Sequence, residues 1–435
     1  MEKYQTYKPS GVEWIGEIPE HWENCRLKHV SKSINGYSFK SEDFDREYEI
    51  PVIRIGDVGD TIDFDDCVKV ESKFLEEKKD FIVKRNDILI GLTGGTIGKS
   101  GKYNYDSSSL LNQRVGLLRN KSNVLNGLLY HYVKSEIFIR YIFYDCYGGG
   151  QDNISMNDIL NMVFPLPPLS EQHQIVQFLD SKTELIDKLI LIKECKINLL
   201  KEQRTLLINK VVTKGLNPIV KMKYSGVEWI GEIPEHWFCV GTNKVYQDLG
   251  TGTTPTSDNK EYYSEDGFHW ITTTDLNEGI MYDTLTKISN KSIIDYPNLR
   301  LYPSGSIYIS MYGGRIGKLG VSTFDSYCNQ SVCVLPKNDK INVKFYYYWF
   351  LGFQELVKNM GRGGGQPNIN KEMIKQFPTV KIDLIEQNEI VVYLDSKTKE
   401  IDDLVDLEQK KIDSLKQYRQ SLISDVVTGK IKVTN

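Results

Sequence analysis

The pattern of apolar and polar positions is most regular in two long stretches, 171–213 and 386–428, neither of which contains proline or glycine. In each stretch isoleucine recurs every eleven residues, and the second set repeats the first 215 positions later. These residues are Ile175, Ile186, Ile197, Ile208, Ile390, Ile401, Ile412 and Ile423. Eleven residues make about three helical turns, so the pattern predicts two long and nearly straight helices.

A second apolar row follows the same step: Leu189, Leu200, Val211, Leu404, Leu415 and Val426. A seven-residue repeat beginning at Leu179 would instead place Lys193 and Lys196 in the contact, which favours the eleven-residue period. Neither helix can bury its own stripe, so we expect the two to pair, most simply antiparallel about an internal two-fold axis. The alternative is that each stripe packs on its own globular region.

The remaining sequence predicts mixed α+β regions. Short β-branched or aromatic runs at 50–58, 86–93 and 306–312 are bounded by turn residues and are typical of strands. The longer apolar runs at 128–143 and 344–360 predict buried helices.

A tandem duplication organises the whole chain. SGVEWIGEIPEHW stands at 10–22 and again at 225–237, and shorter shared segments keep the same offset of 215 residues. A period this long is that of a domain with a connecting element and not of a solenoid repeat. The sequence therefore predicts two similar globular regions, each followed by a long helix, with the boundaries 1–168, 169–215, 216–383 and 384–435.

Composition excludes several classes of protein. Of the 435 residues, 40% are hydrophobic and 26% charged, as in an ordinary globular protein, and neither a membrane span nor a signal peptide is indicated. We therefore expect a cytoplasmic protein. Seven dispersed cysteines without a CxxC pair, and six scattered histidines, favour reduced thiols and no metal site. The net charge of −4 argues only weakly against a nucleic-acid partner, because phosphate contacts depend on local patches.

Two glycine turns offer candidate chemistry. GLTGGTIGKS at 91–100 resembles a phosphate-binding loop, but Thr93 stands where that motif requires glycine, and strand-like sequence follows it. Together with YGGRIGKLG at 312–320, this turn could present backbone N–H groups and a cation to a DNA phosphate. The cations are Lys99, Lys318 and Arg315. The alternative is a hairpin turn with solvated side chains.

Glycine-rich segments precede each long helix as GGGQDNIS and GGGQPNIN. Their amides, Gln151, Asn153, Gln366 and Asn368, can bond base edges or the sugar–phosphate backbone, and a packing role is equally consistent with them. The shared Asn-Gln of LNQRV (111–115) and CNQSV (328–332) favours structural hydrogen bonding. Motifs of methyltransferases, serine hydrolases and zinc proteases are absent from the sequence, so we expect no catalysis.

The order of these segments resembles the specificity subunits of type I restriction–modification systems, over essentially the whole chain. The resemblance rests on the SGVEWIGEIPEHW repeat, on GGGQxNI before each helix, and on FPLPPLSEQHQIVQFLDSKT at the start of the first helix. The second helix starts differently, with FPTVKIDLIEQNEI. The resemblance implies two target recognition domains on an antiparallel coiled coil, reading a bipartite DNA sequence. It also implies partner subunits: two modification subunits that methylate adenine with S-adenosylmethionine, and restriction subunits that cleave DNA with ATP and Mg²⁺. The chain itself then needs no cofactor.

Residues identical in both halves cannot distinguish two different half-sites, so sequence reading is expected where the halves diverge. Examples are GYSFKSEDF (36–44) against GTGTTPTSDNKEYY (250–263), and VIRIGDV against WITTTDL, which exchanges Arg54 for threonines such as Thr272. The predicted DNA-contacting residues are Tyr37, Lys40, Arg54, Thr93, Lys99, Gln151, Asn153, Thr251, Thr253, Thr273, Thr274, Tyr312, Arg315, Lys318, Gln366 and Asn368. The paired helices would then set the unread spacer. The alternatives are a self-contained methyltransferase–nuclease and a coiled-coil scaffold without a DNA role.

Overall fold

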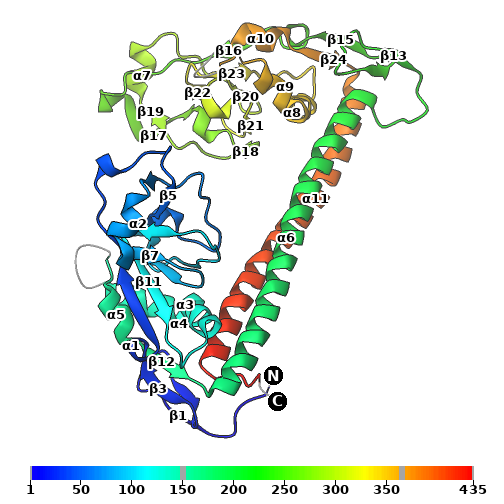
Figure 1. Ribbon diagram of the computed structural model, residues 1–435. Coiled ribbons are helices and arrows are strands. Elements are labelled where there is room, and N and C mark those ends of the chain that lie inside the picture. Colours follow the sequence, from blue (N-terminus) through cyan, green and yellow to red (C-terminus); the bar gives the residue numbers. More distant parts are fainter. Residues whose placement is uncertain (1, 147–152, 362–367, 434–435) are drawn as a thin grey trace. The chain divides into compact units, whose positions relative to one another are not determined.

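The structure, a computed structural model, describes residues 2–146, 153–361 and 368–433 (Figure 1). The chain forms two compact units, of which the first comprises Met1–Glu194 with Lys410–Asn435 and the second comprises Cys195–Gln409. Each unit therefore contains one globular region and one part of each long helix. In the described ranges, no helix is both long and apolar enough to cross a membrane.

The two long helices are α6 (Leu169–Lys214) and α11 (Leu384–Val427) (Figure 1). In the first unit, Ile175 near the start of α6 shares a buried cluster with Ile423 near the end of α11. In the second unit the relation is reversed, because Ile208 near the end of α6 lies with Ile390 near the start of α11. The antiparallel pairing of the helices is thereby confirmed.

The spacing of the buried seam differs from the predicted one. All eight isoleucines are at most 7% exposed. The prediction that the second apolar row is also buried was wrong at two positions, because Leu189 is 39% and Leu404 is 43% exposed. The least exposed positions of α11 alternate in steps of four and three through Leu394, Thr398, Ile401, Val405, Glu408 and Ile412. This is the seven-residue repeat of a coiled coil. Ile401 and Ile412 lie on this repeat because eleven is the sum of seven and four, whereas Ile390 and Ile423 lie one residue away from it and are nonetheless buried. The seven-residue repeat therefore describes the middle of the helix, and the eleven-residue spacing of the isoleucines holds along its whole length.

Polar side chains lie in or beside this seam and are paired. Lys196 Nζ lies 2.9 Å from Oε1 of the buried Glu408, so lysine at the helix contact did not exclude the seven-residue repeat. Two further ion pairs are related by the 215-residue offset. Nε of Arg204 lies 2.9 Å from Asp402 Oδ1, and Nε of Arg419 lies 2.9 Å from Asp187 Oδ1. Paired polar groups of this kind fix the register of a coiled coil, because a shifted register would leave them unmatched.

The repeated His-Trp at the end of SGVEWIGEIPEHW holds the first turn of each long helix. Trp22 and Trp237 are completely buried, and their Nε1 atoms donate to Glu171 Oε2 and Glu386 Oε2 at 3.1 and 2.9 Å. The preceding histidines contact the same carboxylates, at 2.6 Å for His21 and 3.0 Å for His236. The longest shared segment of the sequence therefore docks each globular region onto a helix.

The globular region of the first unit contains two four-stranded sheets, of order β4-β11-β8-β9 and β6-β5-β10-β7, and two strand pairs, β1-β2 and β12-β3. The strands are β1 (Tyr7–Pro9), β2 (Glu17–Pro19), β3 (Glu23–Arg26), β4 (Ser31–Asn35), β5 (Ile50–Ile53), β6 (Lys69–Val70), β7 (Ile82–Val83), β8 (Ile88–Gly91), β9 (Ser100–Lys102), β10 (Ser109–Leu111), β11 (Val115–Asn120) and β12 (Val163–Leu166). The helices are α1 (Leu27–Val30), α2 (Lys73–Glu77), α3 (Asn126–Lys134), α4 (Glu136–Cys146) and α5 (Met156–Asn161).

The second unit repeats this plan with a five-stranded sheet, β16-β23-β20-β21-β18, a three-stranded sheet, β19-β17-β22, and the pairs β13-β14 and β15-β24. The strands are β13 (Met222–Tyr224), β14 (Glu232–Pro234), β15 (Phe238–Gly241), β16 (Gly250–Thr251), β17 (Tyr263–Ile271), β18 (Gly279–Met281), β19 (Lys287–Ile288), β20 (Ile307–Ser310), β21 (Leu319–Ser322), β22 (Tyr327–Cys328), β23 (Val332–Leu335) and β24 (Pro378–Lys381). The helices are α7 (Asn290–Asp295), α8 (Val343–Gly352), α9 (Gln354–Asn359) and α10 (Lys371–Gln376). The α+β class is confirmed in both units.

Each long apolar run outside α6 and α11 forms two helices and not the single one predicted. Between α3 and α4, Ser135 is extended, its hydroxyl donates to the Tyr132 carbonyl, and it accepts from the backbone N–H of Phe138. This side-chain capping competes with a continuous helix, and serine is well suited to it. In the second unit the break falls at Phe353, between α8 and α9.

The two ends of the described chain meet in the first unit. Glu2 forms a β-bridge with Lys432, and the Tyr7 hydroxyl donates to the Gly429 carbonyl. Gly429 has φ +72° and lies so close to Pro19 and Trp22 that a side chain would collide with them. In the second unit, Gly215 lies against Trp237 in the covalent link between α6 and β13. The same joint is therefore built from a continuous segment in the second unit and from two segments far apart in the sequence in the first.

Candidate nucleic-acid interface

Five loops of each globular region are tied together by the same backbone hydrogen bonds, and we call this set the loop frame. In the first unit it joins 36–39, 53–57, 92–98, 111–115 and 153–154. In the second unit it joins 252–255, 271–275, 311–317, 328–332 and 368–369. The two loop frames use equivalent backbone atoms except at one glycine, since Gly36 donates to the Val115 carbonyl and Gly252 to the Asn329 carbonyl, and most of their side chains differ.

The Asn-Gln dipeptide lies at the centre of each loop frame. The backbone N–H of Asn112 donates to the Ile53 carbonyl, and that of Asn329 donates to the Ile271 carbonyl, both at 3.0 Å. Beside them, a β-carbon at Gly36 would lie 2.0 Å from the Asn112 carbonyl oxygen, so only glycine allows this approach. The structural role expected for the asparagines is thus observed.

The glycine turns are hairpin loops within the loop frame. They contain the short 3-10 helices η4 (Gly94–Thr96) and η8 (Gly313–Arg315), and strands follow them, as expected for a hairpin and not for a phosphate-binding loop. Thr93 bridges Asn153, and Tyr312 bridges Asn368. The segments that precede the long helices therefore reach the glycine turns in both units. Gln151 and Gln366 lie outside the described residues.

Positions with equal backbone surroundings carry different side chains. The backbone N–H of Arg54 donates to Asp57 Oδ2 at 2.8 Å, and that of Thr272 donates to Asp275 Oδ2 at the same distance. These aspartates close the 3-10 helices η2 (Ile55–Asp57) and η7 (Thr273–Asp275). An exposed guanidinium in one unit thus replaces a hydroxyl in the other without a change of backbone. Thr273 and Thr274 lie on η7, and Thr274 is exposed.

Some of the side chains predicted to contact DNA are instead packed against other residues of the protein. The Tyr37 ring packs on Phe39 and Phe81, and the Lys78 ammonium lies 4.3 Å from its centroid. Tyr37 is equivalent to Thr253, whose N–H donates to the Cys328 carbonyl.

Four predicted residues lie outside the loop frame, of which Lys99 and Lys318 directly follow its glycine turns. Lys40 pairs with Glu42 beside a separate 3-10 turn. Thr251 belongs to β16, and its carbonyl accepts from the Tyr302 hydroxyl.

The three predicted cations have different surroundings. Lys99 is exposed. Lys318 forms an ion pair with Glu278, which also accepts from Gln354 Nε2. Burial works to raise the pKa of Glu278, but the contacts with Lys318 and Gln354 lower it, so the carboxylate stays charged and balances Lys318. Arg315 donates to the carbonyls of Thr273 and Leu276, both at 2.7 Å. Arg315 therefore positions the η7 loop.

We expect Arg315→Ala to loosen this loop. Each lost hydrogen bond from a charged donor contributes about 1.5–3 kcal/mol, so the local opening free energy of 273–277 should fall by at least that amount. Hydrogen–deuterium exchange of these amides measures it. Lys99→Ala, which removes an exposed cation from the equivalent turn, is the control and should leave exchange at 92–98 unchanged. Equal exchange at 273–277 in the wild type and in Arg315→Ala would refute the positioning role.

The prediction omitted four exposed side chains of the loop frame: Ser38, Gln113, Arg114 and Gln330. Their backbone neighbours are engaged, since the Arg114 carbonyl accepts from the Leu92 N–H at 3.1 Å. The shared Asn-Gln could have indicated the two glutamines from the sequence. The asparagine of each pair is held by backbone hydrogen bonds, and the glutamine beside it is exposed.

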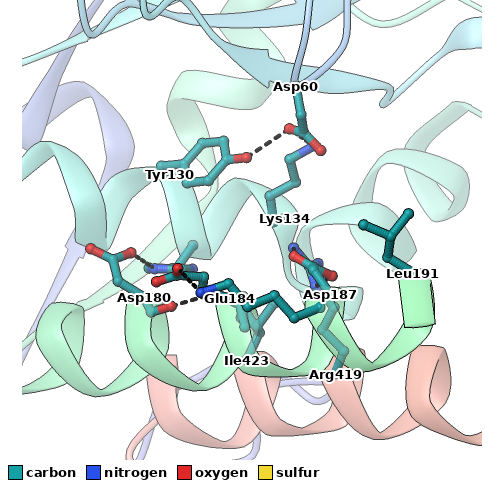
Figure 2. A pocket seen from close by; sticks show the side chains of 12 residues that line it. Asp60, Tyr130, Lys134, Asp180, Glu184, Asp187, Leu191, Arg419 and Ile423 are labelled. Atoms are coloured by element: carbon teal, nitrogen blue, oxygen red, sulfur yellow. Dashed lines mark hydrogen bonds and ion pairs between the residues drawn. The ribbon is translucent and has the colours of Figure 1, made fainter. Parts of the chain in front are cut away.

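A charged hollow of about 480 Å³ lies between the first globular region and its part of the helix pair (Figure 2). Its acids and bases are matched: Lys134 contacts Asp60 at 2.6 Å, His131 contacts Asp180 at 2.7 Å and Arg419 contacts Asp187. Burial works to raise the pKa of Asp60, but Lys134 and the Tyr130 hydroxyl lower it overall. The hollow is therefore lined by paired charges, which hold the first globular region against its part of the helix pair. Among the described residues, no group of three or more His, Cys, Asp or Glu could hold a metal ion.

Comparison with known proteins agrees with this geometry. The family model described as type I restriction modification DNA specificity domain matches residues 19–201 and 247–417. A protein of Methanocaldococcus jannaschii, the type I restriction enzyme MjaVIII specificity subunit, is 25% identical, with 96% of this chain and 95% of the relative covered.

Two solved structures share the fold. One comes from a study of complex assembly and conformational transition of the type I R-M system. It has a TM-score of 0.71 and 16% identity, and 95% of this chain and 99% of that chain are covered. The HsdS subunit from Thermoanaerobacter tengcongensis has a TM-score of 0.50 and 15% identity, with 95% and 98% covered. With a matched domain in each half, the chain belongs to the family of non-catalytic type I restriction–modification specificity subunits.

Proposed function

We propose that each globular region reads one half of a bipartite, asymmetric duplex DNA target through its loop frame. The observation that carries this proposal is the matching backbone of the two loop frames with different side chains at equivalent positions. The exposed Arg54 stands where the second unit has Thr272, whose hydroxyl donates to Asp275, and the exposed Tyr312 stands where the first unit has Thr93. A guanidinium can make two hydrogen bonds to guanine, whereas threonine offers a hydroxyl and a methyl group. Two such surfaces select different bases from one scaffold.

We further propose that the catalytic steps belong to partners: two modification subunits that methylate adenine with S-adenosylmethionine, and restriction subunits that use ATP and Mg²⁺. In each unit α6 exposes two apolar residues seven positions apart, which is the spacing that a further helix would cover. These are Leu185 and Ile192 in the first unit, and Leu199 and Leu206 in the second. This supports docking of partner helices along α6, in the cytoplasm of a prokaryote.

The test is genome-wide mapping of methylated adenine in cells that contain this chain and its partner subunits. Arg54→Ala should relax one position of one half-site, with a loss of about 1–3 kcal/mol of discrimination, and leave the other half-site unchanged. The matched control is Arg85→Ala, which removes an exposed arginine that pairs with Asp106 outside the loop frame and should not alter the motif.

Two results would contradict the proposal. Methylation by the purified chain without added subunits would support the self-contained enzyme. A chain that retains no sequence from a random duplex library would instead support a scaffold without a DNA role.

A further inference from the structure

The start of α11 in the second unit has an open pocket at a place that is filled in the first unit. In the first unit Tyr4 covers the helix-start carboxylate: its hydroxyl donates to Glu171 Oε2 at 3.0 Å, and its ring lies edge-on to Trp22 at 5.9 Å. The position equivalent to Tyr4 is Ile219, which is 89% exposed. A pocket of about 510 Å³, lined among others by Leu216, Val220 and Glu386, lies there instead.

The carboxylate in this pocket retains an unused acceptor. Oε1 of Glu171 contacts His21, and its Oε2 accepts from both Tyr4 and Trp22. In the second unit His236 and Trp237 both contact Oε2 of Glu386. Within the described ranges Oε1 of Glu386 has no hydrogen-bond donor. Oε1 of Glu386 is the counterpart of the oxygen that His21 contacts in the first unit, so a hydroxyl or N–H group from outside the chain can bond it beside the position that Tyr4 covers there.

An apolar hollow of about 560 Å³ adjoins this pocket, because Ile385 and Glu389 line both. Ile385 and Val392 lie seven residues apart on one face of α11 and are 70% and 71% exposed. The first helix has Ser170 and Gln177 at these positions. The apolar face is thus specific to the second unit and is large enough to gain free energy when it is covered.

The charge of the pocket indicates the kind of partner. Asp383, Glu386 and Glu389 line it, whereas the first helix has only one carboxylate among the equivalent positions, since Pro168 and Gln174 replace the other two. Lys214 also lines the pocket, and its ammonium, which donates to the Glu232 carbonyl, offsets one of the three carboxylates, so the lining stays acidic. Complementary charge then requires a basic partner segment.

We infer that this pocket and the adjoining apolar face form a docking site for a modification subunit, which inserts a tyrosine flanked by basic and apolar residues. This rests on the proposed function, because the partner is the modification subunit. The tyrosine hydroxyl bonds Glu386, its apolar neighbours cover Ile385 and Val392, and its basic neighbours face Asp383 and Glu389. The two ends of the helix pair are consequently not equivalent docking sites.

The test is the affinity of the purified full-length chain for purified modification subunit. Ile219→Tyr gives the second unit its own equivalent of Tyr4, three residues before β13 as Tyr4 is before β1, and should weaken binding by about 10-fold or more. The matched control is Ile219→Ser, which leaves the pocket open and should bind like the wild type. The double variant Ile385→Ser and Val392→Gln copies the first helix onto an exposed surface and should weaken binding to a similar extent.

A photo-crosslinking amino acid in place of Asn217 supplies a second readout. In the assembled complex it should label a tyrosine-containing, basic peptide of the modification subunit. Unchanged affinity of Ile219→Tyr, or a crosslink that joins two copies of this chain, would overturn the inference. Failure of the proposed function is distinguishable, because the wild-type chain would then direct no sequence-specific methylation with any amount of modification subunit.

Discussion

Duplicating one seven-residue block in each long helix, residues 193–199 in α6 and 408–414 in α11, should lengthen the unread spacer of the DNA target by about three base pairs. Seven residues add about 10 Å to a helix, and one base pair occupies about 3.4 Å of the duplex axis. The insertion preserves the seven-residue seam, so both helices lengthen without loss of packing. The half-sites should stay unchanged, because the loop frames are untouched.

Mapping methylated adenine genome-wide measures this effect directly, since the original sites should lose methylation and sites with the longer spacer should gain it. The control places the block in α6 alone. That change shifts the two helices relative to each other and separates Arg204 from Asp402 and Lys196 from Glu408, so methylation should be lost. A motif with altered half-sites and the original spacer would exclude the helices as the ruler.

Ile197→Asp should destabilise the helix pair by more than about 4 kcal/mol. Ile197 is 7% exposed and lies in the seam, where a carboxylate would be buried without a counter-charge. Leu199→Asp is the matched control: it places the same side chain two residues further along the helix, where Leu199 is 62% exposed. This variant should change the unfolding free energy by no more than about 0.5 kcal/mol.

Urea denaturation followed by far-ultraviolet circular dichroism distinguishes the two variants, because the helices dominate the signal. The midpoint should fall strongly for Ile197→Asp and stay near that of the wild type for Leu199→Asp. Equal midpoints would mean that the helices do not depend on their seam and are stabilised by the globular regions. That outcome would support the alternative in which each stripe packs on its own region.

The duplication and the helix pair could be predicted from the sequence, because both depend on local patterns. The eleven-residue spacing located the eight buried isoleucines, but it did not show the seven-residue repeat in the middle of α11, to which only Ile401 and Ile412 belong. A seven-residue repeat had been disfavoured because it places lysine in the helix contact, but Lys196 is accommodated there by its ion pair with Glu408. Such a pairing joins residues 212 positions apart and cannot be read from either helix alone.

The sequence indicated which loops belong to the candidate site, but not which contacts their side chains make. Divergence between the halves pointed to the loops of Arg54 and Thr272, which lie at equivalent points of the loop frames, and their contact with DNA stays a prediction. It could not show that Arg315 donates to two backbone carbonyls. An arginine that binds phosphate and one that holds a loop look the same in a sequence, and only the placement of the acceptors separates them.

The bridge between Glu2 and Lys432 brings the first and the last described residues side by side in the first unit. In the second unit the 214–222 link joins the equivalent elements, α6 and β13, covalently. A gene that joined the ends of the described chain and opened this link would encode a circular permutant with every pairing intact. Exchange of one half between related genes would likewise leave both joints in place, so new combinations of half-sites could arise without redesign of the scaffold.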